Sequence, residues 1–191
     1  MTTSMRACVP PILALSLLAT APARADDWQR KLDAGEILVY PGRAESELVL
    51  KAVIDAPPRR VWELVSRCDR YPQTMARVKA ARMISRKGQE VICEVTVDMP
   101  IPFSDLTAVT RAIHEERGDH FARRWQLLRG DYKVNRGSWE LAPFAGQTGR
   151  TLVVYHVHAV PNVSVPRWIR DAAQRRSLPD MIRKLRKLAG S

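Results

Sequence analysis

Residues 91–99 read VICEVTVDM, and this stretch decides the fold class of the chain. Val91, Cys93, Val95, Val97 and Met99 alternate with a more polar set. Successive side chains of a strand point to opposite faces of a sheet, so a period of two predicts a strand with one buried face. Prolines at positions 100 and 102 end this strand.

Similar stretches follow on the C-terminal side and are separated by short turns. Glycines 118, 130 and 146 mark these turns. A strand before Gly88 and four strands after Pro102 are expected, the latter at residues 106–114, 121–128, 132–141 and 151–159. Long strands joined by short turns predict an antiparallel meander.

The N-terminal side combines two short strands with short helices. Residues 37–40 predict an edge strand and residues 48–54 a second strand, after a polar helical start at 26–34. A helix is expected to open at Asp55, as N-cap, with proline in its first turn. A second short helix is expected at residues 71–76.

Residues 165–188 predict a long closing helix. Its apolar stripe comprises Trp168, Ile169, Ala172, Met181, Ile182, Leu185 and Leu188. Arginine and lysine occupy much of the remaining surface. Pro179 predicts a kink or a restart, with Ser177 as the cap.

Together these elements predict an α+β fold in which a curved antiparallel sheet wraps around the C-terminal helix. A helix of about 24 residues spans roughly 36 Å, enough to cover one face of the sheet. A bent sheet and one helix do not close-pack along their whole length, so we expect a cavity lined by inward-facing strand positions.

The first 25 residues predict a secretory signal peptide. They combine Arg6, an apolar run at 8–18 and the small-x-small site Ala23-Arg24-Ala25. The mature chain is expected to begin near Asp26, to form one domain over residues 26–191 and to be periplasmic or secreted. Removal of Arg6 and Arg24 lowers the formal charge from +11 to +9.

Strong basicity favours anionic partners, and export argues against nucleic acid. Cys68 and Cys93 remain after cleavage, and an oxidising compartment would permit a disulfide. The sequence does not show whether they come within bonding distance, and we expect two small buried side chains rather than a bridge.

Eight short segments carry a family resemblance in their order and spacing. They are GEILVY (35–40), VIDAP (53–57), VW (61–62), YP (71–72), GSWELAP (137–143), TLVVY (151–155), VPRWI (165–169) and SLP (177–179). In this arrangement the chain resembles bacterial START-like lipid-binding domains of the Bet v 1-like, polyketide cyclase (SRPBCC) superfamily. The pair at 137–143 and 151–155 is also similar to the last hairpin of its coenzyme Q-binding branch.

The resemblance implies a helix-grip fold, with two short helices after the first long strand, and a tunnel for a lipid, sterol, quinone or polyketide. We therefore predict a protein that binds and transports a hydrophobic small molecule. The alternative is an aromatase/cyclase-like enzyme that uses the same pocket. The resemblance does not decide between them.

The residues show no catalytic set. The chain has no Gly-x-Ser-x-Gly, P-loop, dinucleotide fingerprint or CxxC motif. His156 and His158 share one strand face, but no third ligand is evident, so neither a metal nor a cofactor is predicted. Arg123 shares a face with Phe121 and Trp125, which favours it over Arg124 as an inward arginine.

Candidate pocket residues come from inward strand positions and the closing helix. They are Val95, Val97, Leu106, Arg111, Phe121, Arg123, Trp125, Trp139, Tyr155, His156, Trp168, Ile169 and Ala172. The basic side of the closing helix is first a solvated face, and transient docking on an anionic membrane is a second hypothesis. We expect a monomer.

Overall fold

The computed structural model describes the backbone of residues 23–163 and 167–190, and the side chains of residues 27–163 and 176–190. The helices are α1 (Ala23–Asp33), α2 (Pro58–Val65), the 3₁₀ turn η1 (Cys68–Arg70), α3 (Tyr71–Thr74) and α4 (Arg167–Ala189). The strands are β1 (Leu38–Pro41), β2 (Glu47–Ile54), β3 (Val78–Lys87), β4 (Glu90–Val97), β5 (Leu106–Arg117), β6 (His120–Gly130), β7 (Tyr132–Phe144) and β8 (Gln147–Pro161).

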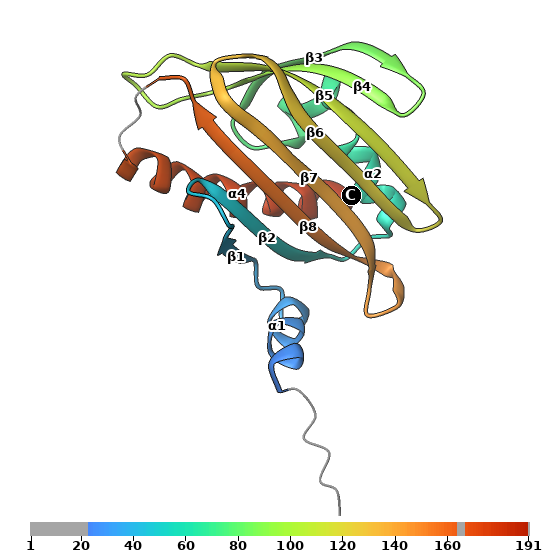
Figure 1. The fold of residues 1–191 in the computed structure, drawn as a ribbon. Coiled ribbons are helices and arrows are strands. Elements are labelled where there is room, and N and C mark those ends of the chain that lie inside the picture. Colours follow the sequence, from blue (N-terminus) through green and yellow to red (C-terminus); the bar gives the residue numbers. More distant parts are fainter. Residues whose placement is uncertain (1–22, 164–166, 191) are drawn as a thin grey trace, which may run out of the picture.

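One antiparallel sheet contains all eight described strands, in the order β1-β2-β8-β7-β6-β5-β4-β3. The sheet curves over α4, which crosses its concave side, while α2 lies toward the other end of that side (Figure 1). The meander from β3 to β8 and the edge position of β1 confirm the predicted fold class. Two short helices follow β2, as expected for the helix-grip fold.

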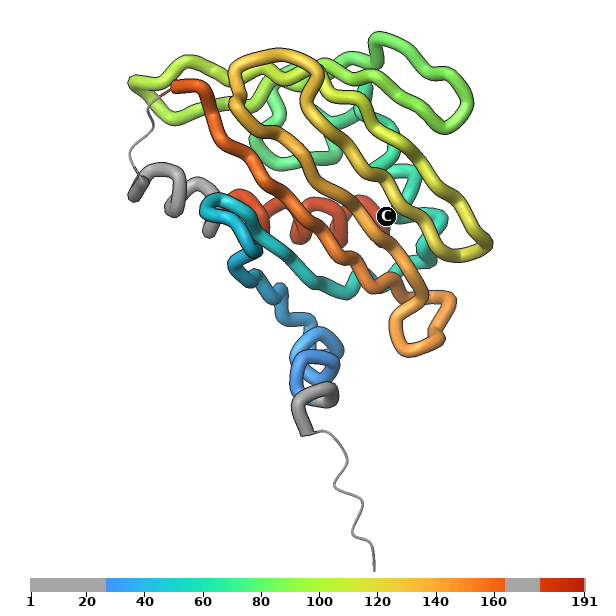
Figure 2. Tube along the Cα trace, viewed as in Figure 1, coloured from blue at the N-terminus to red at the C-terminus, as the bar shows by residue number. Residues whose placement is uncertain are grey.

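Strand β2 joins the N-terminal part of the chain to the last strand of the meander. Its residue Leu50 pairs with Tyr155, and Ile54 pairs with Thr151. Segments about 100 residues apart in the sequence thus lie side by side (Figure 2). This pairing places β1 and β2 beside β8, and β2 contacts α4.

The main core lies between the concave face of the sheet and the helices. The inward positions of β2, β4 and β8 meet α2 and the C-terminal half of α4 there. Its most deeply buried side chains are Leu50, Ile54, Val61, Val65, Val91, Leu141, Val153, Ile182 and Leu185. A smaller cluster on the convex face packs α1 against the sheet through Leu32, Val53 and Phe144.

Two local expectations about the helices were wrong, namely Asp55 as the N-cap of the helix after β2 and a restart of the last helix at Pro179. Pro57, rather than Asp55, is the N-cap residue of α2, and it makes no side-chain capping bond. Asp55 instead accepts a hydrogen bond from Arg150 Nε at 2.8 Å, because β8 brings this arginine to the start of the helix. Helix α4 continues through Pro179 without a restart, so Ser177 does not begin a new helix.

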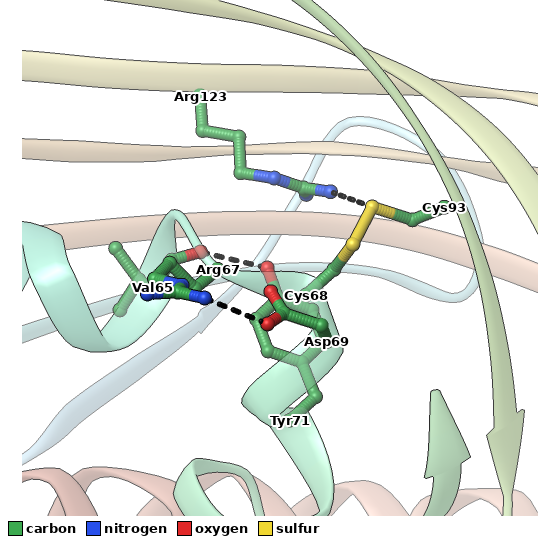
Figure 3. Close-up of a disulfide and its surroundings, with 7 residues drawn as sticks. All are labelled: Val65, Arg67, Cys68, Asp69, Tyr71, Cys93 and Arg123. Carbon is green, nitrogen blue, oxygen red and sulfur yellow. Dashed lines mark hydrogen bonds and ion pairs between the residues drawn. A yellow bond between two sulfur atoms is a disulfide. The ribbon is translucent and has the colours of Figure 1, made fainter. Parts of the chain in front are cut away.

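The expectation that the two cysteines stay unpaired is also wrong. Cys68 and Cys93 form a disulfide, with Cα atoms 6.3 Å apart (Figure 3). The turn η1 packs against β3 and β4 and places Cys68 beneath the inward face of β4. Both residues are fully buried, so the expectation of buried side chains is correct and only the expectation that they stay unpaired fails.

Candidate functional site

A partly open cavity of about 210 Å³ lies between the sheet and α4. Inward positions of β4 to β8 line it on the sheet side, and α4 lines it on the opposite side. Helix α3 and the residues that follow it line a third side. Its lining residues are Tyr71, Met75, Ala76, Val78, Val95, Val97, Ala108, Thr110, Arg123, Trp125, Tyr132, Asn135, Trp139, Tyr155, Ser177, Leu178 and Met181. Most of them are apolar or aromatic.

Three aromatic rings form one continuous surface of the cavity. Tyr155 stacks on Trp125 with ring centroids 5.8 Å apart and tilts against Trp139 at 4.3 Å. Trp125 Nε1 donates to Asn135 Oδ1 at 3.0 Å, so the indole keeps its polar atom satisfied while its face stays apolar. Gly137 lies opposite Trp125 in β7, and a Cβ atom there would collide with the indole. This surface suits a flat or flexible apolar ligand.

Arg123 is the one cationic side chain among the described residues that line the cavity, and it is only 3% exposed. Its Nη2 approaches Cys93 Sγ at 3.9 Å (Figure 3), and its Nε has no hydrogen-bond partner. The guanidinium carbon lies 5.7 Å from the ring centroid of Tyr71 and 5.5 Å from that of Trp125. No ion pair among the described residues includes Arg123. Its guanidinium instead contacts aromatic faces and a sulfur atom.

The tyrosines of the cavity are neutral hydrogen-bonding groups. Burial raises the pKa of Tyr132 to about 12 and raises the pKa values of Tyr71 and Tyr155 as well. The Tyr71 hydroxyl donates to the Val65 carbonyl oxygen at 2.7 Å, which joins the end of α2 to the cavity wall. At neutral pH these groups cannot supply a counterion to Arg123.

His114 pairs with Arg123 in the β5–β6 ladder, so the two side chains are neighbours on one face of the sheet. His114 is 3% exposed. Neither ring nitrogen has a hydrogen-bond partner, and the ring meets Trp62 edge-on at 5.0 Å. Burial, followed by the charge of Arg123, lowers the pKa of His114 to about 4. The imidazole is therefore uncharged at neutral pH.

This histidine should make the fold acid-sensitive. An unfolded histidine has a pKa near 6.5, so between about pH 6.5 and pH 4 the unfolded chain binds the proton and the folded chain does not. Stability is then lost as the pH falls through this window, by about 2 kcal/mol from pH 7 to pH 5. Urea unfolding at both pH values should show a smaller difference in His114→Gln, whereas His120→Gln, at an exposed position, should behave as the wild type.

Six sequence candidates meet at the cavity. They are Val95, Val97, Arg123, Trp125, Trp139 and Tyr155. Leu106 and Phe121 are buried but do not line it, and Phe121 stacks on Trp62 at 5.5 Å instead. The side chains of Trp168, Ile169 and Ala172 lie outside the described residues.

Two candidates lie on the opposite face of the sheet. In β5 the inward positions are even-numbered, as in Thr110 and His114, so Arg111 points outward, where its side chain is 44% exposed near Glu90. In β8 the inward positions are odd-numbered, as in Tyr155, so His156 faces the convex side. Neither residue can contact a ligand in the cavity, since the sheet separates them from it.

Several cavity residues were missed from the sequence. Thr110 and Asn135 occupy inward strand positions, and the alternation of β5 and β7 could have identified them. Tyr71 belongs to the Tyr-Pro segment of the family resemblance but was not given a role. Met75 and Leu178 reach the cavity only through the packing of α3 and α4 against each other, which no local pattern encodes.

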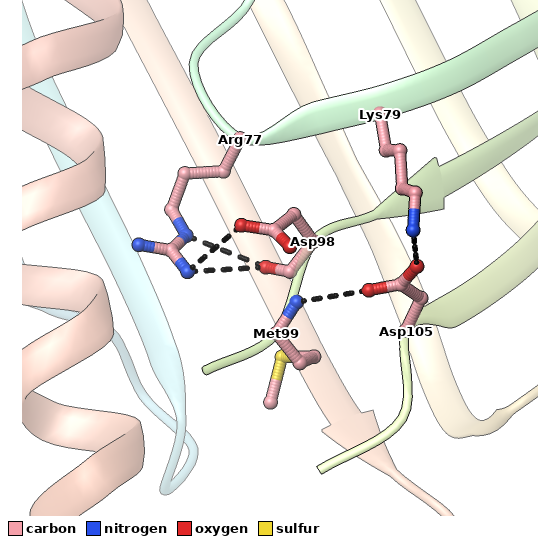
Figure 4. Close-up of polar contacts among 5 residues, drawn as sticks. All are labelled: Arg77, Lys79, Asp98, Met99 and Asp105. Atoms are coloured by element: carbon pink, nitrogen blue, oxygen red, sulfur yellow. Dashed lines mark hydrogen bonds and ion pairs between the residues drawn. The ribbon is translucent and has the colours of Figure 1, made fainter. Parts of the chain in front are cut away.

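Polar contacts fasten the connection between β4 and β5 near the cavity (Figure 4). Arg77 donates to the carbonyl oxygen of Asp98, and Lys79 Nζ lies 2.6 Å from Asp105 Oδ2. Asp105 also accepts from the backbone N–H of Met99 at 3.4 Å, and these contacts lower the pKa of its carboxyl group. Arg77 and Asp98 directly follow lining residues Ala76 and Val97, so the contacts hold this edge of the cavity in place.

Neither a metal centre nor a membrane span stands out in the described chain. Its histidine, cysteine and acidic side chains form no group of three or more that could hold a metal ion. None of its described helices combines the length and the hydropathy needed to cross a bilayer.

A curved antiparallel sheet closed by one long helix defines a domain of the helix-grip fold. A family model described as "Polyketide cyclase / dehydrase and lipid transport" matches residues 54–186. The chain belongs to this family, and the START-like resemblance seen in the sequence is confirmed. No protein of curated function matches the sequence.

Solved structures share the fold at low sequence identity. A STAR-related lipid transfer protein fragment from Xanthomonas axonopodis is 21% identical, with a TM-score of 0.69, over 81% of this chain and 94% of that one. Human StAR-related lipid transfer protein 5 is 12% identical, with a TM-score of 0.64, over 87% and 91%. The Zhui aromatase/cyclase from Streptomyces sp. R1128 is 14% identical, with a TM-score of 0.59, over 80% and 94%.

Proposed function

We propose that the protein binds a hydrophobic small molecule in the cavity beneath α4 and transports it without changing it chemically. The observation that carries this proposal is the cavity. Trp125, Trp139 and Tyr155 line one side of it, and aliphatic side chains of strands and helices line the other. Each Å² of apolar ligand surface that is buried there contributes about 25 cal/mol of favourable free energy to binding. The lipid transfer proteins and the aromatase/cyclase that share this fold are consistent with such a pocket.

The proposal includes export, with residues 1–25 as the signal peptide. The Cys68–Cys93 disulfide supports it, because structural disulfides persist in oxidising compartments and are rare in the cytosol. A protein that carries an apolar ligand between membranes would meet the ligand at a bilayer surface.

Contact with an anionic bilayer is therefore a second part of the proposal, although α4 offers fewer free cations than its sequence suggests. Lys184 Nζ donates to the carbonyl oxygens of Pro72 and Met75, and Arg186 donates to those of Val53 and Gly35. These side chains fasten the helix to the domain. Flotation with anionic and with neutral liposomes tests the contact, and equal binding to both would contradict a charge-driven interaction.

A side chain that fills the cavity should abolish ligand binding. Val95 lines the cavity from β4, and Val95→Phe would place a ring in the space a ligand needs. We expect the affinity for N-phenyl-1-naphthylamine, a neutral dye that fluoresces when it leaves water, to fall at least tenfold. Fluorescence titration of the folded variant measures this loss.

The matched control is Ile113→Phe. Ile113 lies on the convex face of β5 and is exposed, so the same ring there leaves the cavity unchanged. Its dye affinity should equal that of the wild type. If both variants bound the dye equally well, the cavity would not be the binding site.

The enzyme alternative requires a proton-transferring group at the ligand. His156 faces away from the cavity, and burial holds the pKa values of the cavity tyrosines above their usual range. These positions favour binding over acid–base chemistry.

A further inference from the structure

Within residues 27–163 and 176–190, the buried guanidinium of Arg123 has no anionic partner, although carboxylates are present nearby in the fold. Glu115 pairs with Arg124 at 2.6 Å, on the convex side. Glu116 pairs with Arg59 at 2.6 Å and accepts from Trp62 Nε1 at 3.0 Å. Asp69, beside the disulfide, pairs with Arg67 at 3.0 Å (Figure 3). Each of these carboxylates has a cation of its own.

The present surroundings of Arg123 offset only part of the cost of burying a charge. The desolvation penalty of an unpaired buried ion exceeds the stabilisation that a cation–π contact contributes. Its Nε has no acceptor, and the contact of Nη2 is to a sulfur atom, which accepts weakly. His114, on the adjacent strand, makes no hydrogen bond to it. A ligand in the cavity can supply the hydrogen-bond acceptor and the negative charge that these neighbours do not.

A carboxylate suits this position. The guanidinium presents a planar fork of N–H donors that matches the two oxygens of a carboxylate, and charge-assisted bonds of this kind are strong in a dry site. The aromatic rings of Trp125, Tyr155 and Trp139 continue from Arg123 along the cavity, so an apolar body can extend from the headgroup over them.

The volume limits the size of that body. At about 210 Å³ the cavity is smaller than the roughly 300–1,000 Å³ of common ligand pockets. This space suits one medium-length acyl chain or a small ring system. A lipid with two long chains would need far more room.

Building on the proposed function, we propose that the ligand is a compact apolar carboxylate whose headgroup pairs with Arg123. The interaction would neutralise the buried cation and set the orientation of the ligand, with its apolar part against the aromatic wall. Neutral molecules of the same shape would bind more weakly, because they leave the guanidinium unpaired.

The test compares decanoate with 1-decanol, which share one chain length and differ in charge. Each ligand displaces N-phenyl-1-naphthylamine from the full mature protein, and the ratio of their inhibition constants reports headgroup preference. The wild type should prefer decanoate. Arg123→Met, which keeps the length and removes the charge, should reduce this preference at least tenfold while leaving decanol binding intact.

Two further variants keep the result interpretable. Arg124→Met removes the neighbouring arginine on the convex face and should retain the wild-type ratio, whereas Arg123→Lys should retain part of it. A ratio in Arg123→Met within twofold of the wild-type value would overturn the headgroup assignment and leave the cavity proposal standing. If the wild type bound none of the three compounds (the dye, decanol and decanoate), both the headgroup assignment and the cavity proposal would be overturned.

Discussion

The variant that replaces both Cys68 and Cys93 with alanine is expected to lose about 3.5 kcal/mol of stability. The disulfide joins residues 25 positions apart, and closing a loop of this length removes that much chain entropy from the unfolded state. It also ties η1, at the head of the cavity wall, to β4 in the sheet. Urea unfolding of the oxidised wild type and the double variant measures the difference.

Reduction of the wild type supplies the control for this prediction. In dithiothreitol its unfolding midpoint should move toward that of the double variant, whose own midpoint should not change. A double variant as stable as the oxidised wild type would show that the bridge contributes nothing to the fold.

The substitution Ile182→Ala is expected to destabilise the domain by about 3 kcal/mol. Ile182 is fully buried on the side of α4 that faces the core, and large-to-small changes at such sites cost about 2–5 kcal/mol. Because α4 also closes the cavity through Leu178 and Met181, the variant should release bound dye faster as well. Urea unfolding and stopped-flow dye release measure the two effects.

The neighbouring substitution Arg183→Ala is the matched control. Its side chain is exposed and pairs with Asp180 on the same helix, at 2.6 Å. Exposed pairs of this kind contribute about 0.5 kcal/mol or less. Equal losses in the two variants would indicate that α4 is held by its surface charges rather than by its buried face.

The sheet could be predicted because its signal is local. The alternation at residues 91–99 and the glycines at the ends of β5, β6 and β7 define β4 to β8 within a few residues. The strands from β5 onward extend beyond the predicted ends, since ladder pairing with long neighbours continues through polar residues such as Glu115 and Arg117. The local pattern does not contain this tertiary contribution.

The candidate site was predictable only in part, because alternation does not say which face is inward. In β8, Leu152 and Val154 are as apolar as Val153, since the small cluster beneath α1 buries part of the convex face too. His156 was therefore placed in the pocket although it belongs to the outer set. Arg123 shares its face with two large aromatic residues, and that neighbourhood gave the clearer signal.

The disulfide and the capping of α2 depend on contacts between distant segments. Cys68 meets Cys93 only after the η1 turn folds under β4, and Asp55 meets Arg150 only after β2 pairs with β8. No spacing in the sequence encodes either contact. Such contacts follow from the assembled sheet.

Native mass spectrometry of the protein, purified from its native host cells, tests the cavity most directly. We expect a bound species of low mass that dissociates on unfolding, is retained in Ile113→Phe and is missing in Val95→Phe. Two results would contradict the central claim that the cavity binds a ligand. One is the same bound mass in Val95→Phe. The other is a wild type that carries no ligand and binds none of the apolar carboxylates or alcohols offered to it.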